Sequence, residues 1–382
     1  MSGSGRFFPH NIKKILWDIS GAFGDIGVLF PIAIALIMQN GFNPTALFLA
    51  AGLFYILAAY YFKITMPVQP LKAMSAIAIA TGLSFHVINA AGIIMGFILI
   101  ILAVTRFSVK LGSIFPVSVV RGIQLGLGFM LIKTSFGMMN MDISVVFVAG
   151  FILLASIVVF KKIPPLIPIL LLAIALSAKR IELTAVGPVA LSPGLPALDT
   201  LWIGFTLLVI PQIALTFGNA IVATEATGHI LYGEKAKKLN LVNIPASMGI
   251  ANIVSGIMGG APMCHGSGGL TAHCKFGATS PRSGYIIGFS LIVLAVLFGS
   301  SAMAIISVFP KGILGVLLCY VGLQHSLFVR DILQDRAALS VALTTAIAGF
   351  VTGNLTIGFL AGFGMHYALM GFHKTMKFLE EH

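Results

Sequence analysis

Two short stretches of this chain combine helix-breaking residues with groups that can hold a ligand. They are "MPVQPLK" at residues 66–72 and "GGAPMCHGSGGL" at residues 259–270. Proline and glycine interrupt helices. A helix that begins after such a break leaves its first N–H groups unpaired and partly positive. Such an N-terminus binds oxyanions, so we expect the two stretches to form an anion site.

The expected contacts come from the backbone and from a few side chains. Backbone donors are expected around Leu71, Lys72 and Ala73 and around Gly266, Ser267 and Gly268, with Gly269 also allowing close approach. Pro70 suits the first helical position. Gln69 and Ser267 are expected to add side-chain hydrogen bonds. Lys72 either adds positive potential or pairs elsewhere. The alternative is that both breaks are packing kinks, because Gly and Pro are common in membrane helices.

Other chemistries fit the same residues less well. Cys264, His265, His273 and Cys274 are soft metal donors, but their spacing matches no usual zinc pattern, so we expect no metal and interpret His265 as a polar lining residue. The sequence contains neither a phosphate-binding G-x-x-x-x-G-K-[ST] loop nor a nucleophile–base arrangement. We therefore expect neither an enzyme nor a cofactor.

Two acidic residues lie inside apolar segments. Asp25 and Glu225 are candidates for ion coupling, because intramembrane carboxylates often carry protons or bind cations. The repeat position of Asp25 is held by Asn219, a lining candidate. Glu225 lies six residues from Asn219 and near a helix end, where solvent is an alternative partner. We favour Asp25.

The composition requires a membrane. Hydrophobic residues make up 58% of the chain and charged residues only 9%, whereas soluble domains carry about 25% charged residues. The net charge of +12 comes from short turns between apolar segments. This is the positive-inside pattern, which predicts both termini in the cytoplasm, a plasma (inner) membrane and no nucleic-acid partner.

Hydrophobic runs predict about fourteen segments. They span 15–38, 43–63, 68–82, 87–105, 114–134, 143–160, 164–178, 200–230, 240–258, 266–277, 283–299, 302–326, 336–351 and 353–372. The third and tenth are too short to cross a bilayer as helices. We expect both to be half-helices.

The two halves resemble each other. "FGD" at 23–25 recurs as "FGN" at 217–219, Pro67 corresponds to Pro262, and "FP" at 115–116 recurs at 309–310. This near-constant offset predicts a duplication, with repeats at 15–180 and 200–373, a connector at 181–199 and tails at 1–14 and 374–382. Seven segments in each half would invert the second copy, as in secondary transporters.

The motifs also resemble a known family. "MPVQPLKAMSAIA", "GGAPMCHGSGGLTAHCKFG", "GAFGDIGVLFPIAIAL" and "PQIALTFGNAIVAT" are similar to the MOT1-type molybdate transporters, which are related to the sulfate permease (SulP/SLC26) group. The resemblance implies an all-α 7+7 inverted repeat with core and gate domains, and molybdate held between the third and tenth segments. It carries over Gln69, Pro70, Lys72, Cys264, His265, Gly266, Gly268 and Gly269, and it matches Lys275. Ser267 stands where alanine is expected.

The resulting expectation is a secondary transporter for molybdate, coupled to H⁺ or Na⁺, in the lipid bilayer. Sulfate and tungstate remain alternative substrates, because helix N-termini recognise shape and charge rather than the central atom. An uncoupled anion channel remains the alternative mechanism. A homodimer is common among the relatives, and the sequence leaves the oligomeric state open. We expect no cytoplasmic STAS domain after the last segment.

Overall fold

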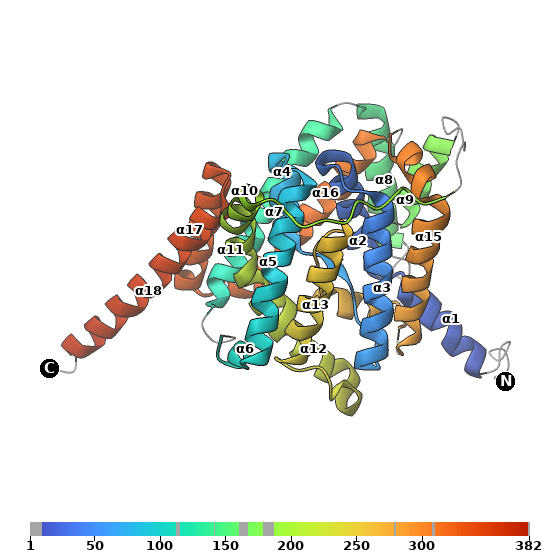
Figure 1. The fold of residues 1–382 in the computed structure, drawn as a ribbon. Helices are drawn as coiled ribbons and strands as arrows, with labels where there is room; N and C mark the ends of the chain where they lie inside the picture. The colour runs from blue at the N-terminus through green and yellow to red at the C-terminus, as the bar shows by residue number, and fades with distance from the viewer. Residues whose placement is uncertain are drawn as a thin grey trace, which may run out of the picture.

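A computed structural model describes residues 10–111, 115–140, 142–159, 167–178, 187–278, 280–307 and 310–380. The described chain is mostly helical (Figure 1). Seven segments are long and apolar enough to cross a membrane: Trp17–Asn40, Pro44–Phe62, Phe85–Val104, Val117–Met139, Leu198–Ala236, Arg282–Ser301 and Lys311–Ile332. Parts of the predicted N-terminal tail, connector and C-terminal tail lie outside the described residues.

The helices of the first half end at Ala178. They are α1 (His10–Ala22), α2 (Ile26–Asn40), α3 (Pro44–Phe62), α4 (Lys72–Thr81), α5 (Phe85–Val104), α6 (Phe107–Leu111), α7 (Val117–Met139), α8 (Ile143–Val159) and α9 (Ile167–Ala178). Strand β1 (Gln69–Pro70) precedes α4.

The second half begins with one long, irregular helical segment. It comprises α10 (Leu198–Gly204), the π-helical η1 (Phe205–Val209), α11 (Ile210–Leu215), the π-helical η2 (Thr216–Val222), α12 (Ala223–Tyr232) and the 3₁₀ turn η3 (Gly233–Ala236). There follow α13 (Asn243–Met258), β2 (Met263–Cys264), α14 (Ser267–Lys275), α15 (Arg282–Ser307), α16 (Lys311–Ser326), η4 (Leu327–Ile332), α17 (Arg336–Thr352) and α18 (Leu355–Glu380).

Several predicted boundaries differ from the structure. The first predicted segment is two helices, because the chain turns at Gly24, whose N–H donates to the carbonyl oxygen of Gly21 at 3.0 Å. Helix α15 continues past the predicted end at 299. Gly299 and Ser300 lie within the helix and contact the connector. A Cβ on Gly299 would lie 3.1 Å from the backbone of Pro188, and the Ser300 hydroxyl donates to the carbonyl oxygen of Gly187 at 2.9 Å.

Local signals explain where other helices begin and end. Pro44 starts α3, and the side chain of Asn43 caps it by accepting a hydrogen bond from the Ala46 N–H at 3.1 Å. Helices α2 and α4 end at Gly41 and Gly82, whose φ angles of 78° and 68° are favoured by glycine.

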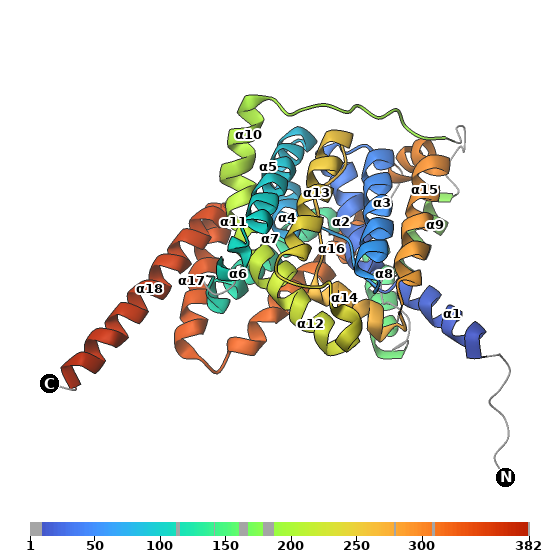
Figure 2. The ribbon, with the colours of Figure 1, turned by 60° about the horizontal axis from the view of Figure 1, so that its bottom comes forward.

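Three long helix pairs cross at reciprocal glycines. A Cβ on Gly52 of α3 would lie 2.6 Å from the carbonyl oxygen of Gly288 in α15, and one on Gly288 would lie 2.7 Å from that of Gly52. The same relationship joins Gly96 of α5 to Gly249 of α13, and Gly128 of α7 to Gly322 of α16. Small residues of this kind let membrane helices approach to backbone contact, so these crossings hold the bundle together (Figure 2).

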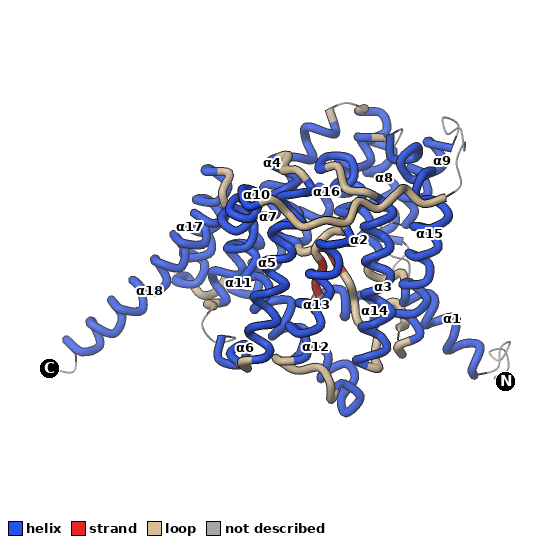
Figure 3. Tube along the Cα trace, in the orientation of Figure 1, coloured by secondary structure: helices blue, strands red, loops and turns tan. Residues whose placement is uncertain are grey.

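The two short helices lie inside this bundle. Helix α4 has ten residues and α14 has nine. Each follows a two-residue strand, and β1 and β2 pair with each other near the middle of the molecule (Figure 3). The expectation of an all-helical chain missed this small ladder.

Candidate anion-binding site

The ladder brings the two interrupted stretches together. Gln69 lies opposite Cys264 and Pro70 opposite Met263 in antiparallel register. The Leu71 N–H extends the pairing by donating to the carbonyl oxygen of Pro262 at 2.9 Å. Helices α4 and α14 therefore begin next to each other, on either side of one pair of strands.

The start of α4 is already capped by the protein. The side-chain oxygen of Gln212, in α11, accepts hydrogen bonds from the backbone N–H groups of Ala73 at 2.9 Å and Met74 at 3.1 Å. Gln212 is buried, and its amide nitrogen donates to Thr216 at 2.9 Å. Of the expected donors, Leu71 and Ala73 are thus both paired internally. Sequence reasoning missed Gln212, although a lone amide within the apolar run "PQIALTFG" was a usable signal.

The start of α14 is open. No hydrogen bond joins the backbone N–H of Ser267, Gly268 or Gly269 to any described residue, and no side chain caps the helix. Gly268 is exposed, and a Cβ placed there would meet nothing within 4 Å. Three backbone N–H groups at a helix N-terminus can donate hydrogen bonds to an oxyanion that approaches from this open side.

A lysine side chain lies beside that helix start. Lys72 is 7% exposed. Its Nζ would be 3.6 Å from a Cβ on Gly266, the residue that immediately precedes α14. The first residue of α4 therefore places its ammonium group over the entry to α14, where it adds positive potential to the helix dipole.

A buried carboxylate, that of Asp25, also lies at the start of α14. The Gln69 amide nitrogen donates to both carboxylate oxygens of Asp25, at 2.5 and 2.6 Å. Gly269 packs directly on this pair, because a Cβ there would lie 2.6 Å from Gln69 Nε2 and 2.7 Å from Asp25 Oδ2. Asp25 thus lies against the first turn of α14, at the break between α1 and α2. The side-chain oxygen of Gln69 is buried without a hydrogen-bond partner in the described part of the chain.

The one thiol and the one imidazole of the second stretch, Cys264 and His265, have separate partners. His265 Nδ1 lies 2.8 Å from the carbonyl oxygen of Pro67, and its Nε2 lies 3.2 Å from the Ser247 hydroxyl. Cys264 Sγ lies 3.9 Å from the carbonyl oxygen of Pro70. His265 is fully buried with both nitrogens engaged, so it braces the ladder from behind.

Two of the remaining candidates lie away from the ladder. Lys275 is exposed at the last residue of α14, with Nζ 6.0 Å from the ring centroid of Phe276. Glu225 is half-buried on α12, and its carboxylate lies near the backbone of Leu241 in the connection to α13.

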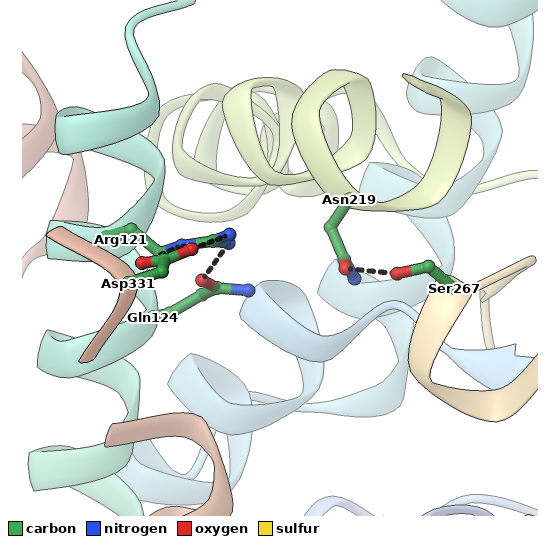
Figure 4. Close-up of polar contacts among 5 residues, drawn as sticks. All are labelled: Arg121, Gln124, Asn219, Ser267 and Asp331. Carbon is green, nitrogen blue, oxygen red and sulfur yellow. Dashed lines mark hydrogen bonds and ion pairs between the residues drawn. The ribbon is translucent and has the colours of Figure 1, made fainter. Parts of the chain in front are cut away.

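Asn219 contacts the first residue of α14. Its side-chain oxygen accepts a hydrogen bond from Ser267 at 3.1 Å (Figure 4). Asn219 lies in η2, and π-helical turns are frequent at functional sites. The amide therefore ties the long irregular segment to the open end of α14.

A second polar group lies on α7, which packs against η2. A Cβ on Gly218 would lie 3.0 Å from Val120. The neighbouring Arg121 forms an ion pair with Asp331 of η4, its Nε donating at 2.8 and 3.0 Å, and its Nη1 donates to Gln124 at 3.0 Å (Figure 4). Sequence reasoning did not single out these residues. They tie α7 to η4.

Known proteins share both this sequence pattern and this fold. A family model described as "Molybdate transporter of MFS superfamily" matches residues 18–131 and 204–325. Molybdate transporter 1 of Arabidopsis thaliana is 28% identical over 402 residues, covering 92% of this chain and 87% of that protein. Molybdate transporter 2 of the same plant is 26% identical over 406 residues, with the same coverage.

Solved structures show the fold. The transmembrane domain of a cyanobacterial bicarbonate transporter, BicA, has a TM-score of 0.67 at 16% identity and covers 92% of this chain and 98% of that domain. SLC26A9 has a TM-score of 0.70 at 14% identity, covering 96% of this chain and 66% of that one. The fold is therefore that of SLC26-like anion transporters, and the sequence match, which spans more than half of the chain, shows that the protein belongs to the MOT1 family of molybdate transporters.

Proposed function

We propose that this protein is a secondary active transporter that moves molybdate across the membrane. The plant relatives named molybdate transporters align along nearly the whole chain. The observation that carries the proposal is the open N-terminus of α14, with three unpaired backbone donors beside the Lys72 ammonium. This combination suits a tetrahedral dianion, because it offers neutral donors and one positive charge without trapping the anion.

The proposed site is asymmetric. The α4 start is occupied by Gln212, so the oxyanion is expected to bind at α14, to the N–H groups of Ser267, Gly268 and Gly269. Lys72 supplies charge from α4. The other predicted contacts at Pro70, Leu71, Ala73, Cys264 and His265 then shape the site through the ladder rather than by touching the anion.

We propose an inverted repeat of seven segments in each half, with the two short helices as half-helices in a core domain that moves against a gate domain. The glycine crossings support it. Gly52 and Gly96 lie at offsets of 197 and 192 from Gly249 and Gly288, so the pair Gly52–Gly288 corresponds to Gly249–Gly96. Gly128 corresponds to its own partner, Gly322, at an offset of 194. Such reciprocity is expected of a pseudo-two-fold axis.

Coupling to H⁺ or Na⁺ is proposed to run through Asp25. Its carboxylate and an incoming dianion would compete for the same positive field, formed by Lys72 and the first turn of α14. Neutralising Asp25 with a proton or a cation removes that competition, which links anion binding to cation binding. Glu225, which faces the α12–α13 connection, is less well placed.

The orientation is proposed to have both termini in the cytoplasm of a plasma (inner) membrane, because lysines and arginines cluster in the turns on that side. A homodimer is proposed by analogy with relatives.

Titration calorimetry on the purified protein tests the substrate. Molybdate, sulfate and tungstate are compared at matched pH and salt. Tight molybdate binding that tungstate displaces and sulfate does not would support the proposal. Tighter binding of sulfate than of molybdate would instead identify the protein as a sulfate transporter. The absence of binding by all three anions would contradict an oxyanion site. Uptake into proteoliposomes that ignores both proton and sodium gradients would favour an uncoupled channel.

A further inference from the structure

An apolar groove runs along the surface between α3 and α13. Helices α3 and α13 lie side by side in both views of the ribbon (Figures 1 and 2). The groove has a volume of about 410 Å³, the size of a small-molecule site. Its walls are mostly hydrophobic and include Leu53, Leu57 and Tyr60 of α3 and Ala246, Ile250 and Val254 of α13.

One end of this α3–α13 groove is basic and aromatic. Tyr60 and Tyr61 line it. The Nζ of Lys63 lies 4.1 Å from the ring centroid of Tyr60, and the Nζ of Lys238 lies 4.7 Å from that of Tyr61. This end coincides with the last turn of α3. Tyrosines and lysines at the ends of membrane helices mark the level of lipid headgroups.

We infer that the α3–α13 groove binds an anionic phospholipid, with an acyl chain along the apolar walls and the headgroup phosphate at Lys63 and Lys238. The mostly hydrophobic walls suit a hydrocarbon chain. The two ammonium groups at one end attract a headgroup that carries a net negative charge. A zwitterionic headgroup has no net charge and is attracted less strongly. The inference does not depend on the identity of the transported anion.

A second copy of this chain suits the groove less well. Two copies inserted the same way into a bilayer share a two-fold axis along the membrane normal. Such a contact would bring the lysine ends of both grooves together on one side of the membrane, where their charges repel. A lipid meets no such penalty.

The floor of the groove reaches the ladder behind the anion site. Phe54 and Ser247 line the groove. The Phe54 ring centroid lies 4.8 Å from that of His265, and the Ser247 hydroxyl lies 3.2 Å from His265 Nε2. His265 in turn contacts the carbonyl oxygen of Pro67, two residues before β1. A bound acyl chain therefore packs over the residues that brace the ladder and should stabilise the fold.

Native mass spectrometry of the purified full-length chain tests the inference. The protein is titrated with phosphatidylglycerol and, separately, with phosphatidylcholine of the same acyl chains. Phosphatidylglycerol should bind about 25-fold more tightly, about fivefold for each lysine. The double variant Lys63→Gln/Lys238→Gln should lose that preference. Phosphatidylglycerol should also raise the thermal unfolding midpoint of the unsubstituted chain but not of the double variant.

Lys237→Gln is the matched control. Lys237 is adjacent to Lys238, but it pairs with Glu234 at 3.3 Å and does not lie over a tyrosine of the groove. This variant should therefore keep the preference for phosphatidylglycerol. Ala246→Trp should fill the groove and weaken both lipids. Equal binding of the two lipids by the unsubstituted chain, or an unchanged preference in the double variant, would overturn the inference. Cross-linking of two copies through Leu57→Cys in a bilayer would assign the groove to a second copy instead.

Discussion

The side-chain oxygen of Gln212 lies 2.9 Å from the backbone nitrogen of Ala73. This bond, with its companion to Met74, makes the two short helices unequal. Helix α4 begins with its Ala73 and Met74 N–H groups bonded to the protein, whereas α14 begins with three N–H groups that bond to no described residue. The site therefore has one structural helix start and one that is free to meet a ligand.

Replacing Gln212 should destabilise the protein. Gln212→Leu leaves two buried N–H groups without an acceptor, which should lower the free energy of unfolding by about 2 kcal/mol. Denaturant unfolding of the purified protein in detergent measures this. Gln39→Leu, at an exposed glutamine of α2, is the control and should change stability little. Equal stability of the two variants would show that the α4 cap contributes nothing.

Filling the open face of α14 should abolish anion binding. In Gly268→Leu the side chain would occupy the open space in front of the three donors, so calorimetry should detect no molybdate binding while the unfolding transition is kept. Gly137→Leu, which also enters open space but on α7, should bind normally.

A companion substitution separates backbone from side-chain recognition. Ser267→Ala keeps all three backbone donors and removes only the hydroxyl that donates to Asn219. Its molybdate affinity should fall by no more than about tenfold. Loss of all binding in Ser267→Ala would mean that the hydroxyl, rather than the helix N-terminus, recognises the anion.

Lys72 should distinguish anions by charge. Lys72→Met removes the ammonium group above Gly266, and the lost Coulomb energy scales with the charge of the ligand. Molybdate affinity should drop ~10-fold or more, and affinity for perrhenate, a tetrahedral monoanion, should drop less. Competition calorimetry compares the two. Lys275→Met, at the far end of α14, should affect neither; an equal drop for both anions would argue that Lys72 acts only through packing.

Asp25 should carry the dependence on a cation gradient. Asp25→Asn removes the charge that competes with the dianion but keeps an oxygen acceptor for Gln69. Molybdate binding should persist, and uptake into proteoliposomes should no longer respond to a proton or sodium gradient. Glu225→Gln should still respond. Gradient-driven uptake by Asp25→Asn would remove this residue from the coupling mechanism.

Local signals were sufficient to predict much of this molecule. The prolines and glycines of "MPVQPLK" and "GGAPMCHGSGGL" located the starts of α4 and α14, and the family resemblance is confirmed by the matched residues. Most helix ends were found to within a few residues, because each is marked by a polar or glycine break.

Contacts between distant parts of the chain could not be predicted this way. Gln212 caps a helix that lies 139 residues earlier, and no spacing rule links the two. The partners of His265 are Pro67 and Ser247, which lie 198 and 18 residues away in the sequence, so its contacts also had to come from the structure. The pairing of β1 with β2 is too short to leave a periodic pattern, so it required the structure.

The ladder also makes the two halves of the chain depend on each other. One strand comes from before the connector and the other from after it, so neither half can align its own short helix. A deletion that shortens "MPVQP" would therefore misplace "APMCH" as well, although the two stretches lie in different halves of the chain. A matching change in the second strand should restore the pairing.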